Sequence, residues 1–267
     1  MSALLKKPRK WVFDLAIIAP EWRRTVSRAL ILPMWESVGA PRFYSRGETE
    51  GISAVGTPIR AATPAGLGTA FTSTDYWTLD SGSAFDANHM GSALTMIAVW
   101  YQPDTTTWTG TFYNSRGTGQ GINLGSLGNT RVRAVIEVNG GANIVPALSG
   151  VAAPEGIRVA ALRWDGTNVE LRADFMRDSP STGSLSGTIT ASQFTPRIGN
   201  DSTSAAMVAP RRLLCMYFFS EWISDIEVFK FFDDPFGPFR MDDDVALFAP
   251  LGIVTISDYR FRQRFFG

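Results

Sequence analysis

Three carboxylates near the end of the chain are spaced in a way that could support acid–base chemistry. Glu221, Asp225 and Glu227 follow the pattern E-x-x-x-D-x-E, and glycoside hydrolases act with two carboxyl groups, about 5–5.5 Å apart when the enzyme retains configuration. Ser224 and Glu227, however, match the S-x-x-E capping box that begins a helix. Asp225 falls in the first turn, where the helix dipole favours an acid. We therefore expect structural carboxylates and predict no enzymatic activity.

His89 and Cys215 are the only histidine and the only cysteine in the chain. His89 lies in the polar stretch 86–90, and no serine in a nucleophile-elbow pattern accompanies it. Cys215 lies inside an apolar segment, where we expect a small buried residue and not a nucleophile. One cysteine and one histidine also exclude disulfide scaffolds, CxxC zinc sites and Cys-His proteases.

Neither a phosphate loop nor a metal site is predicted. The glycines at 117, 119 and 121 precede an expected strand instead of opening a helix, which indicates a hairpin turn. Loop aspartates could supply oxygen ligands to calcium, but their spacing matches no ligand loop. These aspartates are Asp75, Asp80, Asp86 and Asp104. We expect no cofactor.

Three aromatic residues at loops or strand edges are candidates for glycan binding: Trp77, Trp108 and Tyr113. Loops of a β-sandwich can present such rings to a sugar. A tryptophan in this kind of fold more often packs in the core or at its rim. Both interpretations stay open at the level of sequence.

The composition indicates a packed protein that binds neither nucleic acid nor a membrane. Of 267 residues, 45% are hydrophobic and 19% are charged, which predicts a sizeable core. Twenty-five basic residues balance 25 acidic ones, so no nucleic-acid partner is expected. No apolar run reaches the roughly 18 residues of a membrane span, and no membrane partner is expected. The basic start followed by WVFDLAIIAP is interrupted by Asp14, which favours an ordered arm over a signal peptide.

The middle of the chain is predicted to form strands. Short apolar segments alternate with Gly, Ser, Thr and Asn, and Asp165-Gly166 between two alternating runs indicates a hairpin. The run 131–138 alternates polar and apolar residues, which is typical of an antiparallel strand with one wet face. One short helix is expected from the capping box at Ser224. The expected strands span 93–101, 110–115, 121–125, 131–138, 143–148, 157–164, 169–175 and 211–219.

The order of these segments resembles the concanavalin A-like, laminin-G-like jelly-roll domains found in phage and prophage structural proteins. The likeness covers roughly residues 29–240. Its motifs are the stretches 30–39, 68–71, 74–79, 94–103, 159–174, 197–199 and 219–235. The sequence departs from the family at Asp174-Phe175, where a D-G turn is usual, and at Glu221-Trp222-Ile223, where Arg-Ala-Leu is usual. The resemblance implies an all-β antiparallel jelly-roll sandwich with one short surface helix, and in some relatives a calcium site.

Two terminal arms flank this body, at residues 1–28 and 241–267, with the sandwich at 29–240. As a strand, the end of the chain would have one cationic and one aromatic face, and nothing in the short tail covers the latter. Apolar residues in such arms either fold back onto the body or dock onto neighbouring subunits, and we expect docking. The expected docking residues are Trp11, Phe13, Ile17, Trp22, Arg260, Phe261, Arg262, Arg264 and Phe265.

The arms and the phage-type resemblance together predict a non-enzymatic virion structural protein, assembled in a host cytoplasm. We expect a capsid decoration protein held by its terminal arms. Its partners would be the major capsid protein or another virion protein, together with further copies of itself. The alternative is a carbohydrate-binding, lectin-like module on a tail or baseplate that adsorbs to host-surface glycans.

Overall fold

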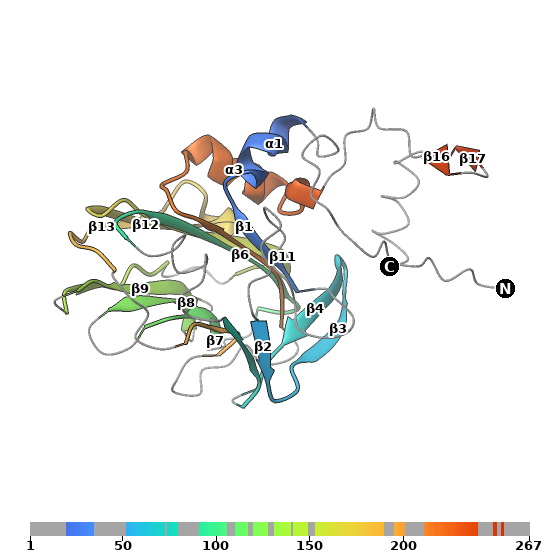
Figure 1. Cartoon of the computed structure of the whole chain (residues 1–267), viewed down its shortest axis with the longest axis horizontal. Coiled ribbons are helices and arrows are strands. Elements are labelled where there is room, and N and C mark those ends of the chain that lie inside the picture. The colour runs from blue at the N-terminus through green and yellow to red at the C-terminus, as the bar shows by residue number, and fades with distance from the viewer. Residues whose placement is uncertain are drawn as a thin grey trace.

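The fold is seen in a computed structural model (Figure 1). The structure describes residues 20–34, 52–72, 74–79, 91–105, 110–116, 120–127, 131–139, 141–148, 153–189, 195–200, 211–239, 248–249 and 252–253.

Within these ranges, the first of two large sheets has eight strands in the order β13-β12-β11-β6-β15-β4-β3, with β1 also paired to β15. All its strand pairings there are antiparallel. The strands are β1 (Leu30–Pro33), β3 (Ile59–Thr63), β4 (Gly66–Ala70), β6 (Leu94–Gln102), β11 (Gly156–Trp164), β12 (Asn168–Ala173), β13 (Ser181–Ser184) and β15 (Arg212–Phe219).

The second sheet, over the same described ranges, has seven strands in the order β10-β9-β8-β7-β14-β5-β2, again with antiparallel pairings. The strands are β2 (Ile52–Val55), β5 (Tyr76–Leu79), β7 (Gly110–Asn114), β8 (Gly121–Leu127), β9 (Arg131–Glu137), β10 (Asn143–Ile144) and β14 (Arg197–Ile198). A separate hairpin pairs β16 (Phe248–Ala249) with β17 (Gly252–Ile253). The all-β antiparallel jelly-roll sandwich expected from the sequence is confirmed.

Alternation along the strands directs one set of side chains into the space between the sheets. On β9, Val132, Ala134 and Ile136 belong to this inner core. The other face of β9 was expected to be exposed to solvent, but Val135 and Glu137 are only 6% and 8% exposed. Periodicity predicted which residues face inward, and it did not predict how far the outward face is covered.

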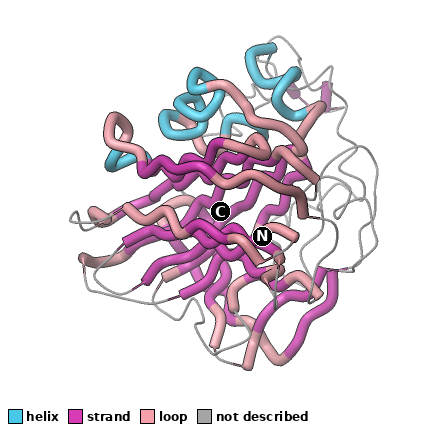
Figure 2. Tube along the Cα trace, turned by 90° about the vertical axis from the view of Figure 1, so that its left-hand side faces the viewer, coloured by secondary structure: helices cyan, strands magenta, loops and turns pink. Residues whose placement is uncertain are grey.

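Helices cover the outer face of the eight-stranded sheet and create a second apolar layer (Figures 1 and 2). The 3-10 turn η1 (Asp174–Met176) packs Phe175 and Met176 against the inner core. The covering elements are α1 (Pro20–Val26), α3 (Asp225–Asp233) and the 3-10 turn η2 (Gly237–Phe239). The central strands therefore bury both faces. The second layer contains Trp22, Ile31, Ile97, Val99, Val159, Leu214, Cys215, Tyr217, Phe219, Val228, Phe231 and Phe232, among others.

The two strongest local signals in the sequence are both confirmed. At α3, the Ser224 hydroxyl accepts a hydrogen bond from the Glu227 amide (3.3 Å), and the Ser224 amide donates to Glu227 Oε2 (3.1 Å). At the hairpin between β11 and β12, Asp165 Oδ1 accepts from the Thr167 amide at 2.9 Å. Both motifs satisfy backbone groups that the turn or helix end leaves without partners.

A buried charge network joins α3 to the hairpin beneath it. Arg163 on β11 is 1% exposed, donates to the Ile223 carbonyl at 2.8 Å and pairs with Asp225 at 2.6 Å and with Glu170. Glu170 Oε2 also accepts from Arg172 Nη2 on β12 at 2.9 Å. A buried guanidinium is tolerated only when its charge is paired, so these contacts fix where α3 begins on the sheet.

Trp22 was expected in a docking arm, but it packs inside this chain. Its side chain is 3% exposed, and its ring meets Phe231 of α3 edge-on with centroids 5.0 Å apart. Gly237 leaves room for it, since a Cβ there would lie 2.0 Å from Trp22 Cε2. Residues 20–28 thus pack against the body. The other docking residues lie outside the described residues, and their role stays a prediction.

Replacing Trp22 by alanine should destabilise the fold by about 3 kcal/mol, because it empties the space between α1, Phe231 and Gly237. Equilibrium unfolding in urea measures this loss. Ile226→Ala is the control, since Ile226 is 72% exposed and its truncation should change the free energy of unfolding by less than about 0.5 kcal/mol. An unchanged unfolding midpoint for Trp22→Ala would mean that the ring is not buried in solution.

Candidate functional site

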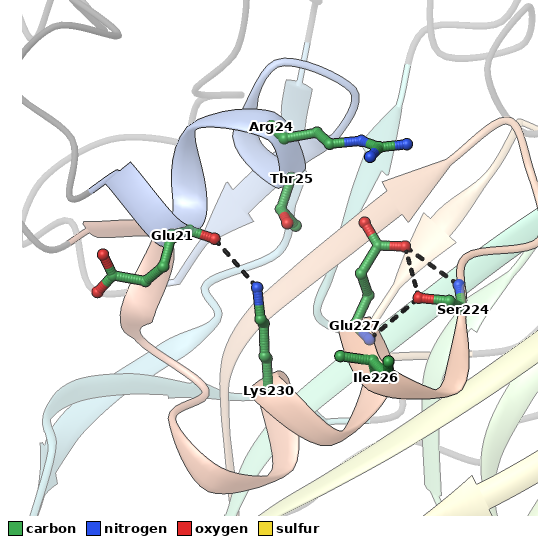
Figure 3. Close-up of a pocket in the computed structure, with 7 residues that line it drawn as sticks. All are labelled: Glu21, Arg24, Thr25, Ser224, Ile226, Glu227 and Lys230. Atoms are coloured by element: carbon green, nitrogen blue, oxygen red, sulfur yellow. Dashed lines mark hydrogen bonds between the residues drawn. The ribbon is translucent and has the colours of Figure 1, made fainter.

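A hollow of about 390 Å³ lies between α1 and α3, on the outer side of the eight-stranded sheet (Figure 3). Its size is within the range of small-molecule sites. We call it the α1–α3 hollow. It is lined by Glu21, Arg24, Thr25, Ser224, Ile226, Glu227 and Lys230.

Arg28 connects the two helices that form the hollow. Its Nη1 donates to Glu221 Oε1 at 2.7 Å, and its Nη2 pairs with Glu227 Oε1. Arg28 follows α1, whereas both glutamates flank or belong to the first turn of α3. A guanidinium presents its donors in a fixed fork, so the end of α1 is held against the start of α3.

Lys230 closes the opposite end of the hollow. Its ammonium group donates to the backbone carbonyl of Glu21 at 3.3 Å (Figure 3). This bond and the packing of Trp22 on Phe231 connect the start of α1 to the middle of α3. The hollow therefore has a fixed frame, with one attachment at each end.

Glu227 is fully occupied by the frame. Its Oε2 accepts from the Ser224 amide at 3.1 Å and from the Ser224 hydroxyl at 3.0 Å, and its Oε1 pairs with Arg28. Burial acts to raise the pKa of Glu227, but the hydrogen bonds from Ser224 and the nearby Arg28 outweigh it and lower the pKa. A general acid needs a raised pKa, so Glu227 is not suited to that role.

The other two carboxylates of the triplet are also committed to structure. Glu221 pairs with Arg28, and Asp225 pairs with Arg163 at 2.6 Å and with Arg172 at 3.5 Å. Each carboxylate thus holds an arginine of the frame or of the buried network. Among these three carboxylates there is therefore no free pair for acid–base chemistry.

The lining side chains of Glu21, Arg24 and Ile226 are exposed, and none of them makes a hydrogen bond or ion pair among the contacts of the described residues. Ile226 in the first turn of α3 is 72% exposed, which leaves an apolar surface beside the polar groups. Arg24 on α1 is exposed, and among the contacts of the described residues its guanidinium has no hydrogen bond or ion pair. Arg24, Ile226 and Lys230 are the contacts that the hollow offers to a ligand, because the Glu21 carboxylate points away from Lys230 and Glu227 (Figure 3).

The predicted glycan-binding aromatics are not brought together at a surface. Trp77 on β5 is 3% exposed, and Tyr113 on β7 is fully buried. The Tyr113 ring packs edge-on against Phe218 with centroids 5.7 Å apart. Both residues belong to the inner core, so neither offers a ring face to a sugar. Trp108 lies outside the described residues.

Of the single cysteine and the single histidine, only the cysteine is described, and it forms no reactive site. Cys215 is fully buried, as predicted, and its burial raises the pKa of the thiol far above the usual range. His89 lies outside the described residues. Within the described ranges there is no cluster of three His, Cys, Asp or Glu side chains that could hold a metal ion. No helix in those ranges is long and apolar enough to cross a membrane.

Sequence reasoning missed the hollow because its two walls are about 200 positions apart in the chain. Pro20-Glu21 is a recognisable helix start, with proline in the first turn followed by an acid. The capping box at Ser224 identified the other wall. Neither signal indicates that the two helices lie next to each other.

No protein-family model matches the sequence, and neither does any curated protein. Solved structures do share its fold. The binding domain of Paraclostridial Mosquitocidal Protein 1 superposes with a TM-score of 0.63 at 12% identity, over 78% of this chain and 52% of that one.

Binding domains of botulinum neurotoxin DC are also similar. One, in complex with SialylT, has a TM-score of 0.59 at 11% identity over 78% of this chain and 51% of that one. Another, in complex with rat synaptotagmin II, has a TM-score of 0.58 at 10% identity over 77% and 51%. The chain therefore spans about half the length of these domains. At such identities the likeness establishes the sandwich fold alone.

Acidification should weaken the frame of the hollow. Because the folded state lowers the pKa of Glu227 below its ordinary value of 4.5, its contribution is present above that value and is lost as the pH falls through the folded pKa. Glu227→Gln should thus unfold more easily than the wild type near neutral pH, with the difference shrinking at about pH 3. Urea unfolding at both pH values measures this.

Ser224→Ala provides the matched test, because it removes a hydrogen bond that lowers the pKa of Glu227. Its difference from the wild type should shrink at low pH in the same direction. A stability gap for Glu227→Gln that keeps its size at both pH values would contradict the assignment.

Proposed function

We propose that this chain is a non-enzymatic carbohydrate-binding domain and that its glycan occupies the α1–α3 hollow. One observation carries the proposal. In the hollow, Arg24 and Ile226 are free to contact a ligand, whereas the Glu227 carboxylate on the α3 wall is already paired with Arg28. Sites for small ligands combine an apolar surface with a few placed polar groups. This hollow offers both, and the carboxylates of its α3 wall form no free acid–base pair.

The structural neighbours support the same class of function. They are receptor-binding domains, and one of them is in complex with SialylT. Because a fold by itself hosts many functions, the likeness only adds weight to what the hollow suggests. A protein receptor remains a competing partner, since another neighbour is bound to rat synaptotagmin II.

A place on a virion is the second part of the proposal, and it is supported by the sequence resemblance to phage structural proteins. In this role the chain is held by its terminal segments on the major capsid protein or on a tail or baseplate, in several copies. The glycan-binding function ranks first because the neighbouring structures are binding domains. The role of capsid decoration has no comparable support.

The full chain, applied to an array of glycans, should show saturable binding to a defined subset. Ile226→Ala should weaken this binding about tenfold, because burial of the isoleucine side chain by a ligand contributes on the order of 1.5 kcal/mol. The affinity for the strongest glycan, measured by calorimetry, gives this ratio.

Ile59→Ala is the control. Ile59 is also exposed, at 48%, but it lies on β3 at an edge of the sheet and not between the helices. It should leave affinity unchanged. The absence of binding to any glycan would refute the function, and equal effects of the two variants would refute the location.

A further inference from the structure

Most acceptor groups of the α1–α3 hollow are already used. Both oxygens of Glu227 bond to Ser224 and Arg28. The backbone carbonyl of Glu21 takes the Lys230 ammonium. In Figure 3 the Glu21 carboxylate points away from Lys230 and Glu227. A ligand in the hollow therefore meets few free acceptors.

The donor groups, in contrast, are largely free. An arginine carries five N–H donors and a lysine three. Among the described contacts Arg24 uses none of its side-chain donors, and Lys230 uses one, on the Glu21 carbonyl. The two cations come from opposite walls, Arg24 from α1 and Lys230 from α3, and both line the same hollow. A ligand group that reached both cations would receive charge-assisted hydrogen bonds from both walls.

We propose that the glycan bound in the α1–α3 hollow carries an anionic group, a carboxylate or a sulfate, held between Arg24 and Lys230. This inference rests on the proposed carbohydrate-binding function and names the class of sugar. Anionic oxygens are the strongest acceptors for guanidinium and ammonium donors.

The charged side chains around the hollow favour a ligand with a single anionic group. Arg24, Arg28 and Lys230 are balanced by Glu21, Glu221 and Glu227, so these six side chains are formally neutral together. An anion is therefore attracted by the positions of the Arg24 and Lys230 donors and not by a net positive charge of the hollow. A neutral surround favours one anionic group at the free donors over a polyanion that would also meet the acidic side chains.

The test compares three small sugars on the full chain by calorimetry: lactose, sialyllactose and sulfated lactose. The expected result is that at least one of the two anionic sugars binds about tenfold more tightly than lactose. Comparing sialyllactose with sulfated lactose shows whether a carboxylate or a sulfate is the recognised group.

Variants then locate the recognition. Arg24→Gln should abolish the preference for the anionic sugar, and because the Arg24 guanidinium has no bond among the described contacts the fold should be unaffected. Lys230→Gln should weaken the preference in the same way, with circular dichroism to confirm that α3 remains folded. Arg24→Lys keeps the positive charge but lacks the planar set of guanidinium donors, so it should retain part of the preference.

Arg23→Gln is the matched control, since it removes the same charge from the same helix outside the hollow. It should leave the preference intact. Binding of lactose and the anionic sugars with equal affinity would overturn this inference while the glycan-binding function stands. Equal loss in Arg23→Gln and Arg24→Gln would also overturn it, whereas no binding of any array glycan would remove the proposed function itself.

Discussion

The attachment of two helices to the outer face of the eight-stranded sheet is the constraint on which the rest of the molecule depends. The central strands are apolar on both faces, so residues such as Ile97, Val99 and Cys215 would meet water without a cover. Trp22 of α1 and Phe231 of α3 supply that cover and pack against each other. One set of contacts therefore completes the second core and also creates the α1–α3 hollow.

The same attachment explains why the charged residues of this region are poor candidates for catalysis. Arg163 and Arg28 lie beneath or between the helices, where an unpaired cation would be costly. Asp225, Glu221 and Glu227 form ion pairs with these arginines and are therefore not free to act as acids or bases. What is left for a ligand is a set of donors and an exposed isoleucine, on a frame with both ends fixed. Such a frame is preorganised, which lowers the cost of binding.

The neighbouring structures give information about the fold, whereas the hollow is a feature of this chain's own side chains. The neighbours share a sandwich with this chain at about one-tenth identity, which says how the strands are arranged and little about side chains. The hollow is built from side chains of this chain alone. A sandwich scaffold tolerates such additions because helices on an outer sheet face can change without altering the strand order.

Local patterns in the sequence determined a large part of the fold. The alternation of strands, the Asp165-Gly166 turn and the capping box at Ser224 act over a few residues, and each formed as predicted. Cys215 was correctly placed in the core for the same reason. These local patterns predicted an all-β sandwich, and the resemblance of their order to the laminin-G-like domains predicted the jelly-roll form.

Only the tertiary structure decided which faces are covered. Trp77 and Tyr113 could have been at a rim, and Trp22 could have been in a free arm, but packing between distant segments buries all three. Residues 21–25 and 224–230 form one hollow because a shared apolar layer brings α1 against α3. No local pattern predicts the contact between α1 and α3. It depends on the free energy gained when apolar surfaces from opposite ends of the chain are buried together.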